Sequence, residues 1–488
     1  MQFPVTSDTI FNVMVSHLEV FVSQSMRQMI EAPKPRGDDN KYHHHHEPCS
    51  DLEQLVASVH RQRASEVTLL LIGRVNRVYI ELRNFPNLRD ACEEISPMVL
   101  KSVIHPSVKN LDCLRYSRHR ELIDYYKIEN CDLIYKTTSL LKGLTDLGIG
   151  KAQRTEEMRL ELRGFSDTLQ KFSSRSCVDR DVEILAENCR KLKCLDISYS
   201  KGISILAVAS ILRFRHLEEL NVGGINNSGD FPLDLLNNLI EDDLSRGMNV
   251  GEGRDSAETA VTSQSPTSTI FRTKFLKKFG FSCSKTLYVI SVTLLSNLTS
   301  LVLTDVKNCT LTPLVSLKSL REFTLWFSTY KLVEGFLKSV GSQLNCLNFT
   351  DVTGTSFDDI VRYCTSVECL HLCFSRSDDL RLPMNWNVPG AILNSSDTLP
   401  SVRTLQLLLD DLAIAEYILT CVRNLRTLFF STLFDRYFYE VVMQRVHCPL
   451  LRNFYWGDNV AVTFEGRNAS ITKFYSNGKR KVQNVVVE

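Results

Sequence analysis

The stretch CRKLKCLDIS (residues 189–198) carries a spacing that decides how the rest of the chain is interpreted. A cysteine is followed at fixed intervals by apolar residues, in the pattern C-x-x-L-x-x-L-x-I. Near-copies of this pattern return as CTSVECLHLC (364–373) and CPLLRNFYWG (448–457). The last two apolar positions alternate with a period of two, so both point to one side of a short strand. Three such copies indicate a repeated structural unit.

The central apolar residue of each phrase serves as an anchor that extends the repeat along the chain. The twelve anchors are Leu147, Phe172, Leu195, Leu220, Phe279, Leu301, Phe323, Leu347, Leu370, Leu405, Leu428 and Phe454. Nine of the eleven steps between successive anchors span 22 to 26 residues. A step of about 20 to 29 residues is typical of solenoids whose unit is a strand followed by a helix.

Segments with helical apolar spacing lie between the strand-like phrases. They are DVEILAENC (181–189), SILAVASIL (204–212), SFDDIVRYC (356–364) and AIAEYILTCV (413–422). A unit of strand, turn and helix cannot bury its apolar side alone, so neighbouring units must stack. We therefore expect an α/β solenoid, a horseshoe with a parallel sheet on its concave face and helices on its convex face, preceded by a mainly helical N-terminal region.

The cysteines of the pattern have a predicted place in this solenoid. Cys189, Cys364 and Cys448 end the helical segments and point inward, so they are predicted to be small core residues rather than reactive thiols or metal ligands. The phrases resemble the cysteine-containing leucine-rich repeats of the ribonuclease-inhibitor-like superfamily, best known from F-box/leucine-rich-repeat proteins. The resemblance covers roughly residues 140–460.

The two long steps between anchors are predicted to be insertions, at about 239–269 and 376–397. The first is rich in glycine, hydroxyl and acidic residues without periodicity, which is typical of a disordered loop. LDCLRYS (111–117) is a candidate degenerate first repeat. The expected division of the chain is an amphipathic helix at 1–31, a linker at 32–50, a helical cap or degenerate F-box-like region at 51–140, the solenoid at 141–460 and a C-terminal tail at 461–488.

Composition excludes several classes of partner and compartment. The 488 residues carry a formal net charge of +1, so neither nucleic acid nor an anionic membrane is an expected partner. Apolar runs fall short of the roughly 18 to 20 residues that a membrane span needs. No secretory signal is recognisable at the N-terminus, so the 15 cysteines are expected to be reduced thiols in the cytoplasm or nucleus.

The sequence contains only weak matches to metal-binding and phosphate-binding motifs. The run His43 to His46 is contiguous and lies in the predicted linker, whereas a structural metal site needs spaced ligands on folded elements. Gly150 and Lys151 are followed by Ala152, so the register of a phosphate loop is wrong. We expect no cofactor, no metal and no enzymatic activity, and an enzyme with a dispersed site is a distant third hypothesis.

The residues that flank the inward anchors are predicted to face the concave surface. The candidate protein-binding residues are Asp196, Asn221, Thr324, Trp326, Asn348, His371, Gln406, Phe429 and Tyr455. This strip is polar in its first half and more aromatic towards its C-terminal half, which favours protein recognition. Alternatively, Trp326 and Phe429 are merely covered by the neighbouring repeats.

The family resemblance implies a function. It is that of a substrate-recognition subunit of a cullin-type ubiquitin ligase, a monomer within a complex that holds its target on the concave face. An adaptor would then bind an F-box-like helix, and the best candidate is 96–114, with Pro97, Leu100, Ile104 and Val108 at roughly that motif's spacing. Ser96 stands where the motif usually has leucine. Alternatively, this region is a plain helical cap, and the protein is a scaffold or regulator of one protein partner without a ligase link.

Overall fold

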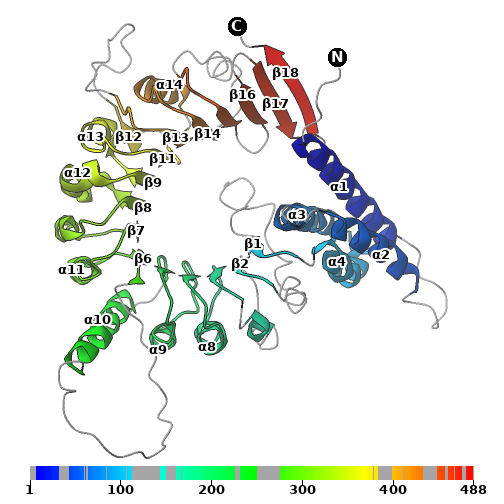
Figure 1. Cartoon of the computed structure of the whole chain (residues 1–488), viewed down its shortest axis with the longest axis horizontal. Helices are drawn as coiled ribbons and strands as arrows, with labels where there is room; N and C mark the ends of the chain where they lie inside the picture. Colours follow the sequence, from blue (N-terminus) through cyan, green and yellow to red (C-terminus); the bar gives the residue numbers. More distant parts are fainter. Residues whose placement is uncertain are drawn as a thin grey trace, which may run out of the picture. The chain divides into compact units, whose positions relative to one another are not determined.

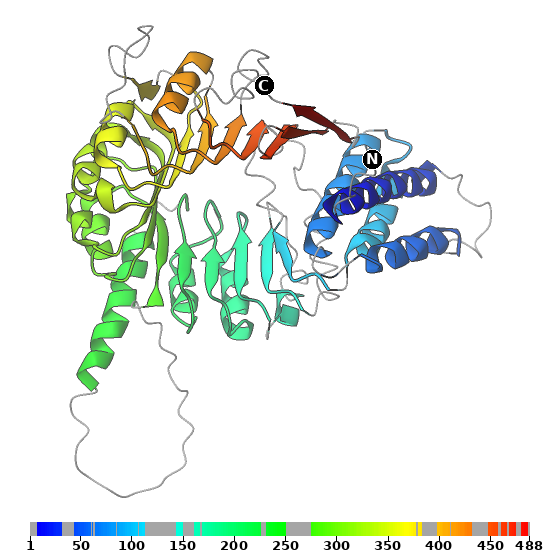
Figure 2. The same cartoon turned by 45° about the horizontal axis from the view of Figure 1, so that its top comes forward.

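The computed structural model divides into two compact units (Figures 1 and 2). The first comprises Met1–Leu195 with Ser476–Lys479, and the second comprises Asp196–Tyr475 with Arg480–Glu488. The residues that the structure describes are 7–31, 43–59, 61, 64–83, 85–105, 107–112, 143–149, 161–165, 168–225, 231–249, 275–376, 379–382, 398–409, 411–431, 448–456, 460–465, 468–474 and 480–486. No helix among them is both long and apolar enough to span a membrane.

Helices make up most of the described part of the first unit, and they pack against one another. They are α1 (Ser7–Glu31), α2 (His43–Ala57), α3 (Ala64–Arg83) and α4 (Arg89–Val103). Apolar side chains about one helical turn apart are buried between them; on α1 and α3 these include Leu18, Val22, Met26, Leu71, Val75 and Val78. Because isolated helices of this length are marginal in water, the shared core holds them in place.

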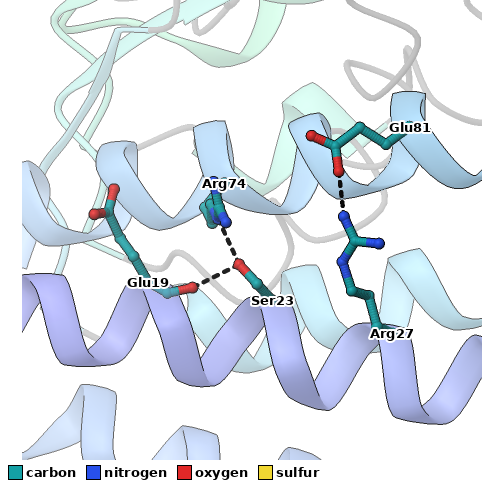
Figure 3. A network of polar contacts seen from close by, with 5 residues as sticks. All are labelled: Glu19, Ser23, Arg27, Arg74 and Glu81. Carbon is teal, nitrogen blue, oxygen red and sulfur yellow. Dashed lines mark hydrogen bonds and ion pairs between the residues drawn. The ribbon is translucent and has the colours of Figure 1, made fainter. Parts of the chain in front are cut away.

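Polar groups add to the contact between α1 and α3 (Figure 3). The Ser23 hydroxyl donates a hydrogen bond to the Glu19 carbonyl oxygen (2.7 Å) and accepts one from Arg74 Nε. Arg27 and Glu81 form an ion pair whose side chains are both exposed by more than a third. Exposed ion pairs contribute little, so apolar burial is the main stabilising term between these helices.

The linker predicted at 32–50 is wrong in its second half, because α2 begins at His43. Cys49, Leu52 and Val56 are buried on one face of this helix, which packs on α4. Their helical spacing outweighs the presence of Pro48 within the helix. Residues 32–42 lie outside the described part of the chain.

The parallel sheet begins in the first unit, so the repeat starts nearer to the N-terminus than predicted. β1 (Asn110–Asp112), β2 (Asp146–Ile149) and β3 (Lys171–Ser174) are parallel neighbours, with Leu111 opposite Leu147 and Leu147 opposite Phe172. The parallel sheet of the solenoid therefore starts with β1, one strand before the predicted boundary at residue 141. Further along the chain follow the 3-10 helix η4 (Glu161–Phe165), α8 (Asp179–Asn188) and β4 (Cys194–Asp196).

Strand and helix alternate through the second unit, as the repeat predicts. The strands that pair as parallel neighbours in chain order are β5 (Glu219–Asn221), β6 (Lys278–Ser282), β7 (Ser300–Thr304), β8 (Glu322–Thr329), β9 (Cys346–Thr353), β11 (Cys369–Cys373), β13 (Thr404–Leu408), β14 (Thr427–Ser431) and β15 (Asn453–Trp456). The helices between them are α9 (Leu206–Ile211), α10 (Phe231–Asn249), α11 (Thr286–Val292), α12 (Glu334–Val340), α13 (Phe357–Tyr363) and α14 (Leu412–Cys421), with short 3-10 turns η6 (Thr312–Ser316), η7 (Tyr330–Leu332) and η8 (Gly341–Gln343). Figure 1 shows the strands on the inner side of this curved unit and α11, α12 and α13 on its outer side. The predicted α/β solenoid is confirmed.

The anchors read from the sequence form one continuous row across these strands. In register order the row is Leu220, Phe279, Leu301, Phe323, Leu347, Leu370, Leu405, Leu428 and Phe454. All of them are fully buried. Burial of a leucine or phenylalanine side chain contributes about 1.5–3 kcal/mol, so this row is the main axis of the core.

The predicted core cysteines are confirmed as buried. Cys189 and Cys364 follow directly on the last residues of α8 and α13, and Cys448 lies in the turn before β15. All three are at most 4% exposed. Burial in apolar surroundings raises the pKa of each thiol to about 12. These thiols therefore stay protonated and unreactive in the folded protein.

Both predicted insertions contain regular structure. The helix α10 covers 231–249, so the expected disorder is wrong for residues 239–249; it buries Phe231, Leu235, Leu236 and Leu239. The buried residues have helical spacing, but the polar and acidic residues that follow Leu239 favour the prediction of a loop. In the second insertion, β12 (Leu380–Arg381) pairs in parallel with β10 (Thr355–Ser356). Residues 250–274 and 383–397 lie outside the described part.

The C-terminal segment is folded, so the tail predicted at 461–488 is wrong. β16 (Val460–Glu465), β17 (Asn468–Phe474) and β18 (Arg480–Val486) form an antiparallel meander that continues from β15. Alternating apolar residues face the core, and Val462, Phe464 and Ile471 are buried. An unpaired edge strand exposes backbone hydrogen-bonding groups, so the meander covers the edge of the last repeat.

Candidate functional site

One row of side chains follows directly after the buried anchors in the second unit. In register order it is Asn221, Gly280, Val302, Thr324, Asn348, His371, Gln406, Phe429 and Tyr455. Strand residues alternate between two faces, so this row lies on the face opposite the helices. The side chains from Thr324 to Phe429 in this row are half-buried, and Tyr455 is 38% exposed. The structure thus brings seven of the nine predicted concave residues into one line, namely Asn221, Thr324, Asn348, His371, Gln406, Phe429 and Tyr455.

Aromatic rings occupy the C-terminal end of the row. Phe429 and Tyr455 stack with ring centroids 4.7 Å apart and planes at 9°. The pair lies on β14 and β15, the last two parallel strands. Tyr455 keeps more than a third of its surface accessible, so the pair forms an apolar platform beside the polar part of the row.

Trp326 lies apart from that platform. Its ring stacks on Tyr199, with centroids 6.2 Å apart and planes at 18°. Tyr199 in turn lies over Gly224: a Cβ atom added at Gly224 would come within 2.4 Å of the tyrosine ring. Trp326 therefore belongs to a second aromatic cluster, nearer the N-terminal end of the second unit. Sequence reasoning missed Tyr199, although the Gly223-Gly224 pair at the same point of the next repeat was a visible signal.

Backbone conformation explains why a glycine lies under Tyr199. Tyr199 has a φ of 61° and Gly224 a φ of 68°. Left-handed backbone is rare for residues with a Cβ atom and easy for glycine. The turns after β4 and β5 thus each contain a residue in the left-handed conformation. At Tyr199, which has a Cβ atom, packing against neighbouring side chains must maintain this conformation.

Three polar side chains of the predicted concave set form hydrogen bonds within the protein. The Oδ1 atom of Asp196 accepts hydrogen bonds from the backbone N–H (3.0 Å) and hydroxyl (2.6 Å) of Ser198. Asn221 Oδ1 accepts from the Gly223 N–H at 3.1 Å. Asn348 Oδ1 accepts from the Thr350 hydroxyl at 3.3 Å. These groups order the turns and strands, so a partner gains less from them than from the aromatic end.

Two half-buried thiols lie next to each other on neighbouring strands. Cys346 on β9 is the register partner of Cys369 on β11. The hydrogen bond between the thiols lowers the pKa of Cys369 and raises that of Cys346. No group of three or more His, Cys, Asp or Glu side chains with the geometry of a metal site occurs among the residues that the structure describes.

Three of the four predicted adaptor-binding residues have buried side chains. Pro97 and Leu100 belong to α4, and Ile104 and Val108 follow it. Leu100, Ile104 and Val108 are 0%, 8% and 1% exposed. They fill the core of the first unit, because α4 is amphipathic and turns its apolar side towards the other helices. Leu100, Ile104 and Val108 are therefore core residues, and an adaptor contact of this segment stays a prediction.

His105 holds the end of α4 in that core. It is 3% exposed, and its backbone N–H donates to the Thr68 hydroxyl oxygen at 3.1 Å. The Nδ1 atom accepts a hydrogen bond from the Ser107 N–H (2.9 Å), so Nε2 carries the proton that is donated to the Val59 carbonyl oxygen (3.2 Å). Every polar atom of this histidine has a structural partner, which leaves none for catalysis.

Comparison with known proteins adds to the description of the fold. No family model and no curated protein sequence matches the chain. Similar solved structures include an internalin from Listeria monocytogenes, at 15% identity over 68% of this chain and 89% of that chain, with a TM-score of 0.30. The Rad7–Elc1 complex from yeast matches at 15% identity over 70% and 79%, with a TM-score of 0.38. The TLR13–ssRNA13 complex matches at 13% identity over 66% and 47%, with a TM-score of 0.31.

These likenesses concern the fold alone. The repeat length, the parallel register and the alternation of strand and helix define the chain as a leucine-rich-repeat solenoid. Its further resemblance to the F-box type rests on the sequence phrases.

Proposed function

We propose that this chain is a non-catalytic protein-recognition subunit that binds a target protein on the concave face of its solenoid. The observation that carries the proposal is the row from Asn348 to Tyr455, which ends in the stacked pair Phe429 and Tyr455. A few aromatic anchors supply most of the affinity of typical protein interfaces, with polar neighbours that set specificity. The residues of this row retain accessible surface although their strands are in the middle of a folded sheet.

The test is capture of partners from cells that express the tagged chain. Phe429→Asp and Tyr455→Asp are expected to lose a protein that the unaltered chain retains, because each places a carboxylate in the apolar contact. Leu450→Asp is the matched control, since Leu450 is 51% exposed in the turn before β15 and lies outside the row. Equal capture by all the variants would place the binding surface elsewhere.

A ubiquitin-ligase role is the more specific form of the same proposal. The chain would hold its target on the concave face, and the helices of the first unit would contact an adaptor of a cullin complex. The first unit exposes Val20, Leu55 and Phe85, which are 50%, 44% and 54% accessible and are available for such a contact. In the alternative form, the chain is a scaffold or regulator of one partner without a ligase link.

Point variants separate these two forms. Leu55→Asp and Phe85→Asp are expected to lose cullin-complex components while they retain the target of the concave face. If no cullin component is captured by the unaltered chain, the scaffold form stands. Far-UV circular dichroism of each variant shows whether the helices are kept.

A further inference from the structure

Arginine occupies the same position in three consecutive repeats. Arg403, Arg426 and Arg452 each precede the buried anchor of their repeat by two residues, and all three are exposed. The Arg426 N–H donates to the Arg403 carbonyl oxygen, and the Arg452 N–H donates to that of Arg426, both at 2.8 Å. Adjacent strands lie about 4.8 Å apart, so the three side chains start from neighbouring points at the N-terminal ends of β13, β14 and β15. We call this set the arginine ladder.

The ladder is not neutralised within the part of the chain that the structure describes. None of its guanidinium groups forms a hydrogen bond or an ion pair with a described residue. β11, β13, β14 and β15 contain no acidic residue. Glu368 holds the equivalent position in the preceding repeat, where its carbonyl oxygen accepts the Arg403 N–H at 2.9 Å. At the other end, Glu465 on β16 follows Phe464, whose N–H donates to the Arg452 carbonyl oxygen at 2.8 Å. Three arginines still exceed these two acidic residues, and like charges on adjacent strands repel each other.

The ladder runs beside the aromatic pair. Arg426 directly precedes β14 and Arg452 directly precedes β15, and Phe429 and Tyr455 each lie three residues further along the chain. The N–H groups of Arg426 and Thr427 both donate to the Arg403 carbonyl oxygen, so regular strand alternation begins only at Thr427 and does not turn Arg426 towards the buried face. Three residues of strand span about 10 Å, which two to three residues of an extended peptide also cover. A single bound segment can therefore reach both the guanidinium groups and the exposed ring of Tyr455.

We infer that the arginine ladder and the Phe429–Tyr455 pair together bind an acidic segment of a partner protein, with carboxylates on the arginines and an apolar or aromatic side chain on the rings. The inference rests on the proposed function and names the chemistry of its target. Arginine pairs with carboxylate in a bidentate geometry, and such pairs are stronger than neutral hydrogen bonds. A net charge of +1 provides no long basic track for nucleic acid.

The test is direct binding of defined probes to the full chain. The first probe is a fluorescent synthetic peptide of glutamate and aspartate around a central Tyr-Leu pair; the second has glutamine and asparagine in place of the acids, and the third is single-stranded DNA of equal charge. Fluorescence anisotropy measures each affinity at several salt concentrations. The acidic peptide is expected to bind at least about tenfold more tightly than the neutral one, and its affinity is expected to fall with salt.

Matched variants assign the binding to the ladder. The triple variant Arg403→Ala, Arg426→Ala and Arg452→Ala is expected to lose about tenfold or more in affinity for the acidic peptide and most of its salt dependence. The control Lys307→Ala, Lys331→Ala and Lys338→Ala removes the same charge from exposed positions elsewhere in the second unit and is expected to change little. Equal losses in both variants, no loss in the arginine variant, or tighter binding of the DNA would overturn the inference.

Target capture distinguishes this inference from the proposed function. If Phe429→Asp loses the captured target and the arginine variant keeps it, the acidic-segment inference fails and concave recognition stands. If the arginine variant loses the target together with Phe429→Asp, both are supported. If neither variant loses it, the proposed function itself fails.

Discussion

Phe429 and Tyr455 stack face to face because they are register partners on adjacent parallel strands. Their 4.7 Å centroid separation matches the spacing of neighbouring strands, about 4.8 Å. Equivalent side chains in successive repeats thus meet at van der Waals contact without any special arrangement of the backbone. The same geometry aligns the arginine ladder, so one rule produces both parts of the candidate surface.

The register predicts losses of stability of very different size for two neighbouring residues on β14. Leu428→Asp is expected to destabilise the second unit by about 4 kcal/mol or more, because it buries an unpaired carboxylate in a fully buried position. Phe429→Asp is expected to cost about 1.5 kcal/mol or less, because the side chain reaches solvent. Urea denaturation followed by circular dichroism measures both values. A Phe429→Asp loss as large as that of Leu428→Asp would show that Phe429 is a core residue.

Gly224 is predicted to tolerate no side chain. Gly224→Ala is expected to destabilise by about 1–3 kcal/mol, because it combines a left-handed backbone with a close approach to the Tyr199 ring. Gly335→Ala is the control: a Cβ atom there meets nothing within 4 Å, and the residue lies in α12. That variant is expected to be neutral or slightly stabilising. Adding Tyr199→Ala to Gly224→Ala should recover the part of the loss that comes from the ring contact.

The thiols are predicted to react in two groups. Half-buried Cys369 and Cys373 should be alkylated in the native protein. Cys189 and Cys364 should resist until the protein unfolds, because burial raises their pKa to about 12. Mass spectrometry of a labelling time course measures the rates. Native labelling of Cys189 as fast as that of Cys373 would contradict the predicted core.

Labelling should also depend on pH in a residue-specific way. The hydrogen bond from Cys346 lowers the pKa of Cys369, so the Cys369 thiolate persists to lower pH than an ordinary thiolate. Its alkylation rate is therefore expected to fall less than that of a free cysteine between about pH 8 and about pH 7. Cys346→Ala removes the donor, and the alkylation rate of Cys369 should then fall more steeply over this pH range. An unchanged profile in this variant would rule out the thiol–thiol contact as the cause.

The helix α10 offers a test of the corrected insertion. Leu239→Ala is expected to destabilise by about 2–5 kcal/mol, because Leu239 is fully buried. Asn237→Ala, on the exposed side of the same helix, should change the stability by less than about 0.5 kcal/mol. Thermal denaturation of both variants measures the difference. No effect of Leu239→Ala would mean that this stretch is a loop, as its composition first indicated.

Several features of the protein follow from sequence alone because they are local and periodic. An apolar residue such as Leu347 or Leu370 must face the core whenever strand alternation and a 22 to 26 residue step recur together. The same parity puts Asn348 and His371 on the opposite face, and it places Cys364 inside at the end of a helix. Register among the repeats then needs no long-range information, since each unit contacts only its neighbours.

Other features needed the tertiary structure, because they depend on what covers a segment. Leu100 and Val108 have the spacing of an exposed adaptor helix, yet the other helices of the first unit bury them. The strands β16–β18 replace a predicted tail because the open edge of β15 provides a template for pairing. The stacking of Tyr199 on Trp326 joins residues from repeats that are distant in the chain. Periodicity determines which side of an element is apolar, but only packing determines which partner fills the space beside it.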